Sequence, residues 1–334
     1  MKRKVILLPL VIVLVFAVLS IGLIASCAAP SGITGGNRVG LLYIEGLIMS
    51  GKASDFPFAT AGAMSDHIVE VIQQAIDDKG IKALIIRINS PGGSSAASQE
   101  IFQAIKRFRE TGRPVVVSMA DVAASGGYYV AAAADEIYAD PSTLTGSIGV
   151  AMQLVGYEGL FHLIGLDDRS LYAGQYKDIG SPTRPMTDQE KQILQTLIDQ
   201  VYGQFWKDVA AERGFKDEQK ADIAEGMIFS GEQAKDKGLI DSLGGLHEAI
   251  VAAGVKSGLG EKPVVEELGK TGLLDQLLGN VGPTSLAGRS QNGVAGTVAQ
   301  ALDPLDAGEN PFYRLWQLML VDPRLLSDPA GLRF

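Results

Sequence analysis

The chain has 334 residues, of which 46% are hydrophobic and 20% are charged, and its formal net charge is −9. This length allows one large domain or two small ones. The acidic balance argues against non-specific binding to nucleic acid. The single cysteine, Cys27, excludes an intramolecular disulfide and a cysteine-based zinc cluster.

The first 27 residues have the pattern of a membrane anchor or a lipoprotein signal. Three basic residues at 2–4 precede an apolar run at 5–25, which has about the length that spans a bilayer. The basic flank predicts a cytoplasmic N-terminus with the remainder of the chain outside. Residues 24–27, Ile-Ala-Ser-Cys, also resemble a bacterial lipobox, so lipidation at Cys27 stays open as the alternative, with simple secretion as a third. Residues 28–37 are small and polar and predict a flexible tether.

Strand-like and helix-like segments alternate from residue 38 onward. Apolar runs at 39–44, 83–88 and 115–119 predict buried strands, and helical spacing of apolar residues begins after Asp66. Between the second strand and a helix expected at 95–110 lies the turn Asn-Ser-Pro-Gly-Gly-Ser at 89–94. This alternation predicts an α/β layered core.

The most informative stretch is residues 121–150, DVAASGGYYVAAAADEIYADPSTLTGSIGV. Ser125 stands at the start of an expected helix and is followed by Gly126 and Gly127. A serine at this place is commonly a helix N-cap. It can also be a nucleophile, because the glycines allow close approach and first-turn N–H groups can hold an oxyanion. The residues of this stretch leave both interpretations open.

The second half of the chain predicts further helices and one loop of chemical interest. A strand is expected at 136–139, a helix at 157–164 and a strand at 168–172, before the loop 173–178 that contains Lys177. Thr187 and Glu190 have the spacing of a capping box at the start of a long helix. Shorter helices are expected at 217–225, 231–237 and 246–254.

A serine nucleophile needs a group that accepts its proton. The three histidines, His67, His162 and His247, lie in helix-like contexts and not in motif-like loops. A lysine can act as the base when its surroundings favour the neutral amine. Lys177 is the best-placed lysine in the sequence, although by composition alone a solvated surface lysine is the commoner role.

Four blocks in order resemble the signal peptide peptidase family of membrane-bound Ser/Lys peptidases, also known as the SppA or protease IV type. They are NSPGG at 89–93, the stretch at 121–150, GQYKDIGSPTRPMT at 174–187 and GLIDSLGG at 238–245. The resemblance covers residues 38–255 and has the length of the short form of the family. It implies a ClpP/crotonase-like α/β spiral of strand–strand–helix units.

The resemblance also implies roles for individual residues. Ser125 matches the family's nucleophile, Lys177 its general base, and Ser147 the serine that hydrogen-bonds and positions the lysine. The backbone amides of Gly93 and Gly126 match the oxyanion hole. Beside them, Gly92 shapes the turn and is expected at the substrate-binding site.

The implied reaction is acyl transfer on remnant signal peptides and other apolar peptides at a membrane. It requires no metal and no cofactor, and the expected partners are peptides, the membrane and other copies of the chain, not nucleic acid. Short-form members assemble as homo-oligomeric rings or domes in which neighbouring chains share each active site. The expected location is the cell membrane, with the catalytic domain outside the cytoplasm.

Two other functions compete with the peptidase. A crotonase-type acyl-CoA hydratase or isomerase shares the fold, but it would use carboxylates and would not need Ser125 or Lys177. An inactive scaffold that binds membrane proteins is the non-enzymatic alternative. The end of the chain carries no recognised motif: residues 256–309 predict a weakly patterned linker, and the apolar residues of 310–334 predict a docking segment.

Overall fold

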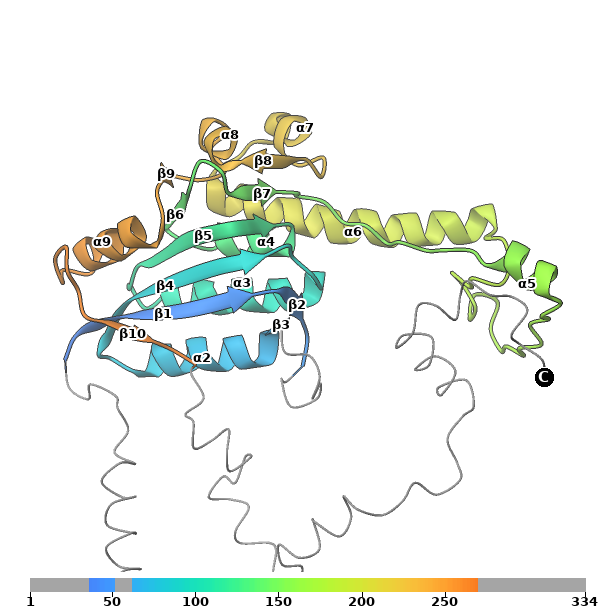
Figure 1. Ribbon diagram of the computed structural model, residues 1–334, viewed down its shortest axis with the longest axis horizontal. Helices are drawn as coiled ribbons and strands as arrows, with labels where there is room; N and C mark the ends of the chain where they lie inside the picture. Colours follow the sequence, from blue (N-terminus) through green and yellow to red (C-terminus); the bar gives the residue numbers. More distant parts are fainter. Residues whose placement is uncertain (1–35, 52–61, 270–334) are drawn as a thin grey trace, which may run out of the picture. The chain divides into compact units, whose positions relative to one another are not determined.

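The structure, a computed structural model, describes residues 36–51 and 62–269. These residues form a mixed α/β fold around one large, mostly parallel sheet (Figure 1). The order across the sheet is β10 (Val265–Glu267), β1 (Arg38–Glu45), β4 (Ile81–Ser90), β5 (Val115–Ala124), β6 (Glu136–Ala139) and β9 (Ser242–Leu243). β7 (Leu144–Gly146) pairs with the end of β5, and β8 (Ile228–Ser230) pairs antiparallel with β7. A separate parallel pair consists of β2 (Leu47–Met49) and β3 (Gly62–Met64).

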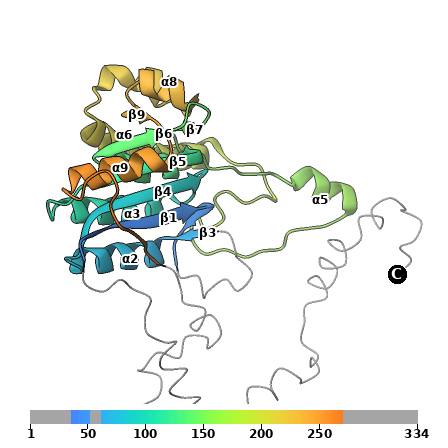
Figure 2. The ribbon, with the colours of Figure 1, turned by 60° about the vertical axis from the view of Figure 1, so that its left-hand side comes forward.

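Helices cover both faces of the sheet (Figures 1 and 2). One face carries α2 (Ser65–Asp77), α3 (Ser95–Arg109) and α4 (Gly126–Ala132), and the other carries α9 (Leu246–Lys256). The remaining helices are α5 (Glu158–Ile164), α6 (Asp188–Arg213), a 3₁₀ turn η2 (Asp217–Gln219), α7 (Lys220–Ile223) and α8 (Gly231–Asp236).

The central strands are apolar on both sides because both faces of the sheet are covered. In β4, Leu84, Ile86 and Ile88 point into the core beneath α2, α3 and α4. The alternate residues Ala83 and Ile85 pack in the second core with Ala249 and Ala253 of α9. The near-continuous apolar runs of the sequence therefore predicted a sheet buried on both faces, and the structure has one.

Two expected elements differ from the structure. The strand expected at 115–119 continues to Ala124, because its second half pairs with β7 and runs on to Ser125. The strand expected at 168–172 is absent, and those residues are irregular. Leu171 is 98% exposed, so its apolar character does not reflect burial within a sheet of this chain.

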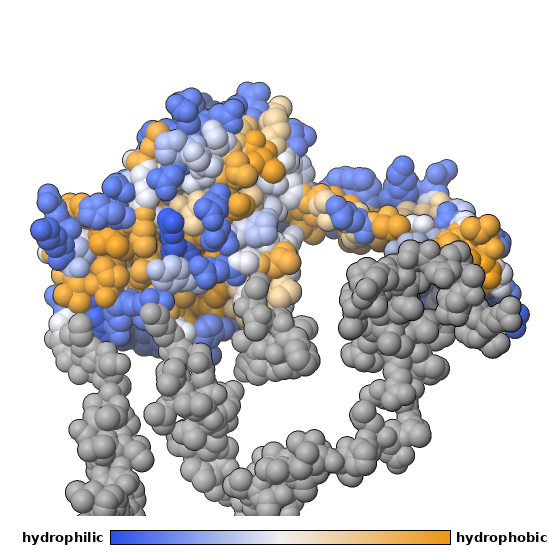
Figure 3. All heavy atoms as spheres, in the orientation of Figure 1, coloured by the Kyte–Doolittle hydropathy of each residue, from blue (hydrophilic) through white to orange (hydrophobic). Residues whose placement is uncertain are grey.

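Residues 150–200, here called the arm, extend from the body that contains the sheet (Figure 1). The arm includes α5, in which no residue is buried, and the first half of α6. Most of the large apolar side chains that are exposed in the described residues lie in it, among them Leu154, Leu163 and Leu171. Figure 3 shows hydrophobic residues along the surface of the arm and at its end. Within one chain the arm leaves much apolar surface uncovered.

Several expectations fall on residues outside the described ranges. These are the apolar run at 5–25, Cys27, most of the tether and the segment 310–334. Within residues 36–51 and 62–269, no helix combines the length and apolar character that crossing a bilayer requires. At the other end of the described chain, β10 joins β1, so the sheet continues past residue 255.

Candidate active site

Ser125 stands where β5 ends and α4 begins. Its backbone has φ 53° and ψ −120°, and its side chain makes no capping hydrogen bond to the helix. Among the non-glycine residues that the structure describes, only Ser125 and Ser147 have a positive φ. Such a conformation costs free energy and occurs preferentially at functional sites. Of the two interpretations that the sequence left open, the geometry therefore disfavours the simple helix cap.

The pairing of β5 with β7 brings the two serines together. Ala124 is the register partner of Gly146, so the next residues, Ser125 and Ser147, continue side by side. The Ser125 N–H donates to the Gly146 carbonyl at 2.8 Å, and the Ser147 N–H donates to the Met227 carbonyl at 2.7 Å. Both serines are partly buried, and both line one pocket of about 430 Å³.

The turn after β4 packs directly against Ser125. A Cβ added to Gly92 would lie 2.8 Å from the Ser125 Cβ and 2.8 Å from the Gly126 nitrogen. Gly92 also has φ 105°, a conformation that favours glycine. No larger residue fits here without moving the serine or the Gly126 amide.

Gly93 forms an isolated parallel bridge with Ile48, but its own N–H is left out of that bridge. The two bonds run from the Ile48 N–H to the Gly92 carbonyl and from the Ser94 N–H to the Ile48 carbonyl. This pattern turns the Gly93 N–H to the opposite side of its strand. The Gly93 nitrogen lies 3.3 Å from where a Gly126 Cβ would be.

Gly126 begins α4, so its N–H has no acceptor within the helix. The Gly93 and Gly126 amides thus stand close together, with Ser125 beside them. Two backbone donors next to a hydroxyl can stabilise the oxyanion that forms when the hydroxyl attacks a carbonyl. The structure brings Ser125, Ser147, Gly92, Gly93 and Gly126 into one region.

Lys177 is not part of this group within the chain. It lies in the arm, in a series of turns where its N–H donates to the Gly174 carbonyl at 3.1 Å. Its side chain is exposed and does not line the pocket that contains Ser125 and Ser147. No hydrogen bond or ion pair joins its amine to another residue in the described ranges.

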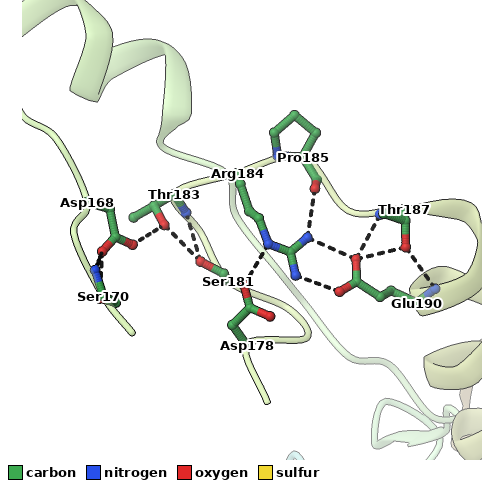
Figure 4. A network of polar contacts seen from close by, with 9 residues as sticks. All are labelled: Asp168, Ser170, Asp178, Ser181, Thr183, Arg184, Pro185, Thr187 and Glu190. Carbon is green, nitrogen blue, oxygen red and sulfur yellow. Dashed lines mark hydrogen bonds and ion pairs between the residues drawn. The ribbon is translucent and has the colours of Figure 1, made fainter. Parts of the chain in front are cut away.

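The residues next to Lys177 form a dense polar network (Figure 4). The Arg184 Nε donates to Asp178 at 2.7 Å, and its two terminal nitrogens donate to Glu190 at 3.0 and 2.5 Å. Hydrogen bonds from Arg184, and next from Thr187, lower the pKa of Glu190 to about 2, and Arg184 also lowers the pKa of Asp178. Both carboxylates are therefore charged at neutral pH.

The three histidines are placed apart from the candidate site. His67, His162 and His247 are all exposed, and none lines the pocket beside Ser125. Likewise, no group of three His, Cys, Asp or Glu side chains could hold a metal ion in the part of the chain that the structure describes.

The sequence did not reveal the wall of the pocket. Gln195, Ile198, Asp199 and Tyr202 of α6 line it, together with Glu225. The four α6 residues share one helix face by spacing, but only the packing of α6 against α4 turns that face toward Ser125. Burial and nearby Glu225 raise the pKa of Tyr202, which stays a neutral hydroxyl.

Comparison with known proteins assigns the chain to a class. The profile of peptidase family S49 matches residues 107–259. The chloroplastic serine protease SPPA of Arabidopsis thaliana is 35% identical over 86% of this chain, which spans 42% of the length of that relative. A provisionally named signal peptide peptidase SppA of Enterococcus faecium is 32% identical over 72% of this chain and 70% of its own length.

One solved structure, an S97A mutant of the 1510-N membrane-bound stomatin-specific protease, is 19% identical with a TM-score of 0.43. The alignment covers 71% of this chain and all of that one. The family profile and the curated relatives place the chain in the class of serine peptidases. It belongs to peptidase family S49 and is of the SppA type.

Proposed function

We propose that the chain is a membrane-tethered serine endopeptidase with a Ser/Lys dyad, which cleaves remnant signal peptides and other apolar peptides through an acyl-enzyme. The observation that carries the proposal is the strained Ser125, which stands beside the Gly93 and Gly126 amides. Membership of peptidase family S49 supports it, as does the name of the Enterococcus faecium relative.

In the proposed reaction, the neutral amine of Lys177 takes the proton of the Ser125 hydroxyl while the Ser125 Oγ attacks the scissile carbonyl. The Gly93 and Gly126 amides stabilise the resulting oxyanion, and a donor of this kind contributes about 3 kcal/mol. Lys177 then gives its proton to the leaving amine as the peptide bond breaks. Lys177 next takes a proton from a water molecule, whose oxygen attacks the acyl carbonyl. As the bond between this carbon and the Ser125 Oγ breaks, Lys177 returns the proton to the Oγ, which frees the acid product and restores the serine and the neutral lysine. Ser147 would accept or donate a hydrogen bond to hold the lysine.

The proposed assembly is a homo-oligomeric ring or dome of ClpP/crotonase-like units. Two observations support it: Lys177 is absent from the pocket of its own chain, and the arm that carries it exposes apolar side chains. We infer that Lys177 of one chain serves Ser125 of its neighbour. Packing of the arm against the neighbour would cover that apolar surface.

We further propose that the apolar run at 5–25 anchors the chain in the cell membrane, with lipidation at Cys27 as the alternative. The catalytic domain would then lie outside the cytoplasm. The proposal follows from the basic flank at 2–4 and the length of the run. Mass spectrometry of the intact N-terminus distinguishes an uncleaved anchor from a lipidated Cys27.

The test is hydrolysis of a fluorogenic peptide with apolar residues before the cut, measured from pH 6 to 10. We expect Ser125→Ala and Lys177→Ala each to lower kcat/KM by at least about 10³-fold. Lys191→Ala, an exposed lysine of the same arm, is the matched control and is expected to keep wild-type activity. Full activity of Lys177→Ala would exclude the dyad. A correctly assembled but inert wild type would favour the scaffold.

Mixing the two inactive variants tests the shared site. If neighbouring chains build each site, co-assembly of Ser125→Ala with Lys177→Ala places an intact Ser125 opposite an intact Lys177. We expect about a quarter of the sites to recover on random mixing of equal amounts, by simple counting of the four pairings at each contact. No recovery from verified mixed oligomers would mean that each chain builds its own site.

A further inference from the structure

The residue after the proposed base carries the charge that would most readily pair with it. Asp178 follows Lys177 directly, yet its carboxylate accepts a hydrogen bond from the Arg184 Nε at 2.7 Å. The Asp178 side chain is 17% exposed, whereas Lys177 lies exposed and unpaired among the described residues. The arm therefore separates two neighbouring opposite charges that would otherwise attract each other.

Arg184 is itself held on several sides (Figure 4). Its guanidinium binds both carboxylate oxygens of Glu190 and the Pro185 carbonyl. Glu190 is only 4% exposed and also accepts hydrogen bonds from the Thr187 N–H and hydroxyl at 2.9 and 3.0 Å. A planar guanidinium with this many partners has one geometry, which a lysine at the same position could not reproduce.

The fixed position of Asp178 matters for a base, because a free lysine amine accepts a proton only when it is neutral. A carboxylate close to a lysine favours the charged form. The charged groups that follow Lys177 in the network are Asp178, Arg184 and Glu190, and Asp168 joins the same network through Thr183. The titratable groups that line the receiving pocket are Asp199 and Tyr202 of α6 and Glu225, which the neighbouring chain would present.

We propose that Arg184 is a positioning residue for the general base: it holds the carboxylates of Asp178 and Glu190 so that Lys177 has no ion-pair partner on its own arm. This inference rests on the proposed Ser/Lys function and adds a residue to it. Arg184 acts through Asp178 and does not touch the substrate. Loss of the arginine would free Asp178 to pair with Lys177.

The test is the pH dependence of kcat/KM for the full-length oligomer. In Arg184→Ala we expect the rising, low-pH limb of the profile to move by about half to one unit toward higher pH, since a nearby unpaired carboxylate has an effect of about this size. On that limb kcat/KM should fall about three- to tenfold. The double variant Arg184→Ala/Asp178→Asn should return the limb to its wild-type position. Arg169→Ala is the matched control, because Arg169 pairs with Asp167 on the same arm and both are exposed.

The outcomes separate this inference from the proposed function. An active Lys177→Ala variant would refute the dyad and the role of Arg184 together. If Lys177→Ala is inactive but the low-pH limb of Arg184→Ala stays in its wild-type position, only the role of Arg184 is refuted. Any loss of kcat/KM in Arg184→Ala that is equal at every pH would then indicate a structural effect. If Arg184→Ala does not assemble, Arg184→Gln keeps a hydrogen-bonding side chain without the charge. Its limb must shift in the same direction, or the inference fails.

Discussion

Ser125 and Ser147 both have a positive φ, which L-residues rarely adopt, and neighbouring chain segments hold both backbones by hydrogen bonds. Each serine N–H is fixed to a carbonyl, one from Gly146 and one from Met227. Strain of this kind costs about 1–3 kcal/mol per residue and persists only where the surroundings determine it. At the residue scale, backbone hydrogen bonds therefore fix the positions of the two serine hydroxyls, and the glycines beside them determine the shape of the candidate site.

The first prediction concerns Gly93. An alanine there would place its Cβ 2.1 Å from the Ile48 carbonyl oxygen and 2.7 Å from the Ile48 nitrogen, so the turn must shift. We expect Gly93→Ala to lower kcat/KM by about 10²-fold or more, the effect of losing one oxyanion donor. The measurement is peptide hydrolysis together with the thermal midpoint of unfolding.

The control for Gly93 is Gly112→Ala. Gly112 also has a positive φ, at 79°, but no heavy atom lies within 4 Å of its added Cβ. We expect it to lose about 1–2 kcal/mol of stability from its backbone conformation and to keep wild-type kcat/KM. Equal catalytic losses in both variants would show that strain, not the Gly93 amide, determines the effect.

At the scale of elements, local motifs were predictable and long-range placement was not. Thr187 and Glu190 form the capping box that their spacing predicted, because capping needs only residues three apart. No strand forms at 168–172, because a strand needs a pairing partner and the local sequence, Asp-Arg-Ser-Leu-Tyr, does not show whether one is within reach. The face of α6 that lines the pocket could not be predicted either, since it depends on stacking of Phe205 against Tyr129 of α4.

The second prediction follows from Glu190 at the start of α6. Its pKa falls from an ordinary 4.5 to about 2, chiefly through the Arg184 hydrogen bonds. A carboxylate with a lowered folded-state pKa stabilises the fold above its unfolded value, and this contribution disappears as the pH falls toward the folded value. We therefore expect hydrogen exchange in residues 178–195, corrected for intrinsic rates, to accelerate between about pH 4.5 and 2.

The variant Glu190→Gln checks the cause. It should show the faster exchange of residues 178–195 already at pH 7, with little further change on acidification. Glu232→Gln, an exposed glutamate in the first turn of α8, is the matched control and should leave this segment unchanged. A wild-type exchange pattern in Glu190→Gln would mean that the network does not hold the arm.

At the scale of the whole molecule, the sequence motifs indicated candidate residues but not how the fold places them relative to one another. The blocks around Ser125 and Lys177 were both identified, and nothing in either block indicates that one lies in the body and the other in the arm. The sequence predicted a helix at 157–164 and a strand at 168–172 in this part of the chain, but it did not predict how much apolar surface the arm would leave exposed. The exposed apolar residues of the arm leave a surface that the proposed assembly would cover.

The last prediction tests that use of the arm. Leu163 and Leu171 are 82% and 98% exposed, so charging them should not unfold the chain that carries them. If the arm packs on a neighbour, Leu163→Glu/Leu171→Glu buries two unpaired carboxylates at the contact, at a cost of several kcal/mol. We expect sedimentation velocity to show dissociation, and peptidase activity to fall at least about tenfold, with an unchanged circular dichroism spectrum. Val255→Glu, which is 57% exposed on α9 of the body, is the control and should keep both assembly and activity. An intact, fully active oligomer of the double variant would show that the subunit contact does not use Leu163 and Leu171.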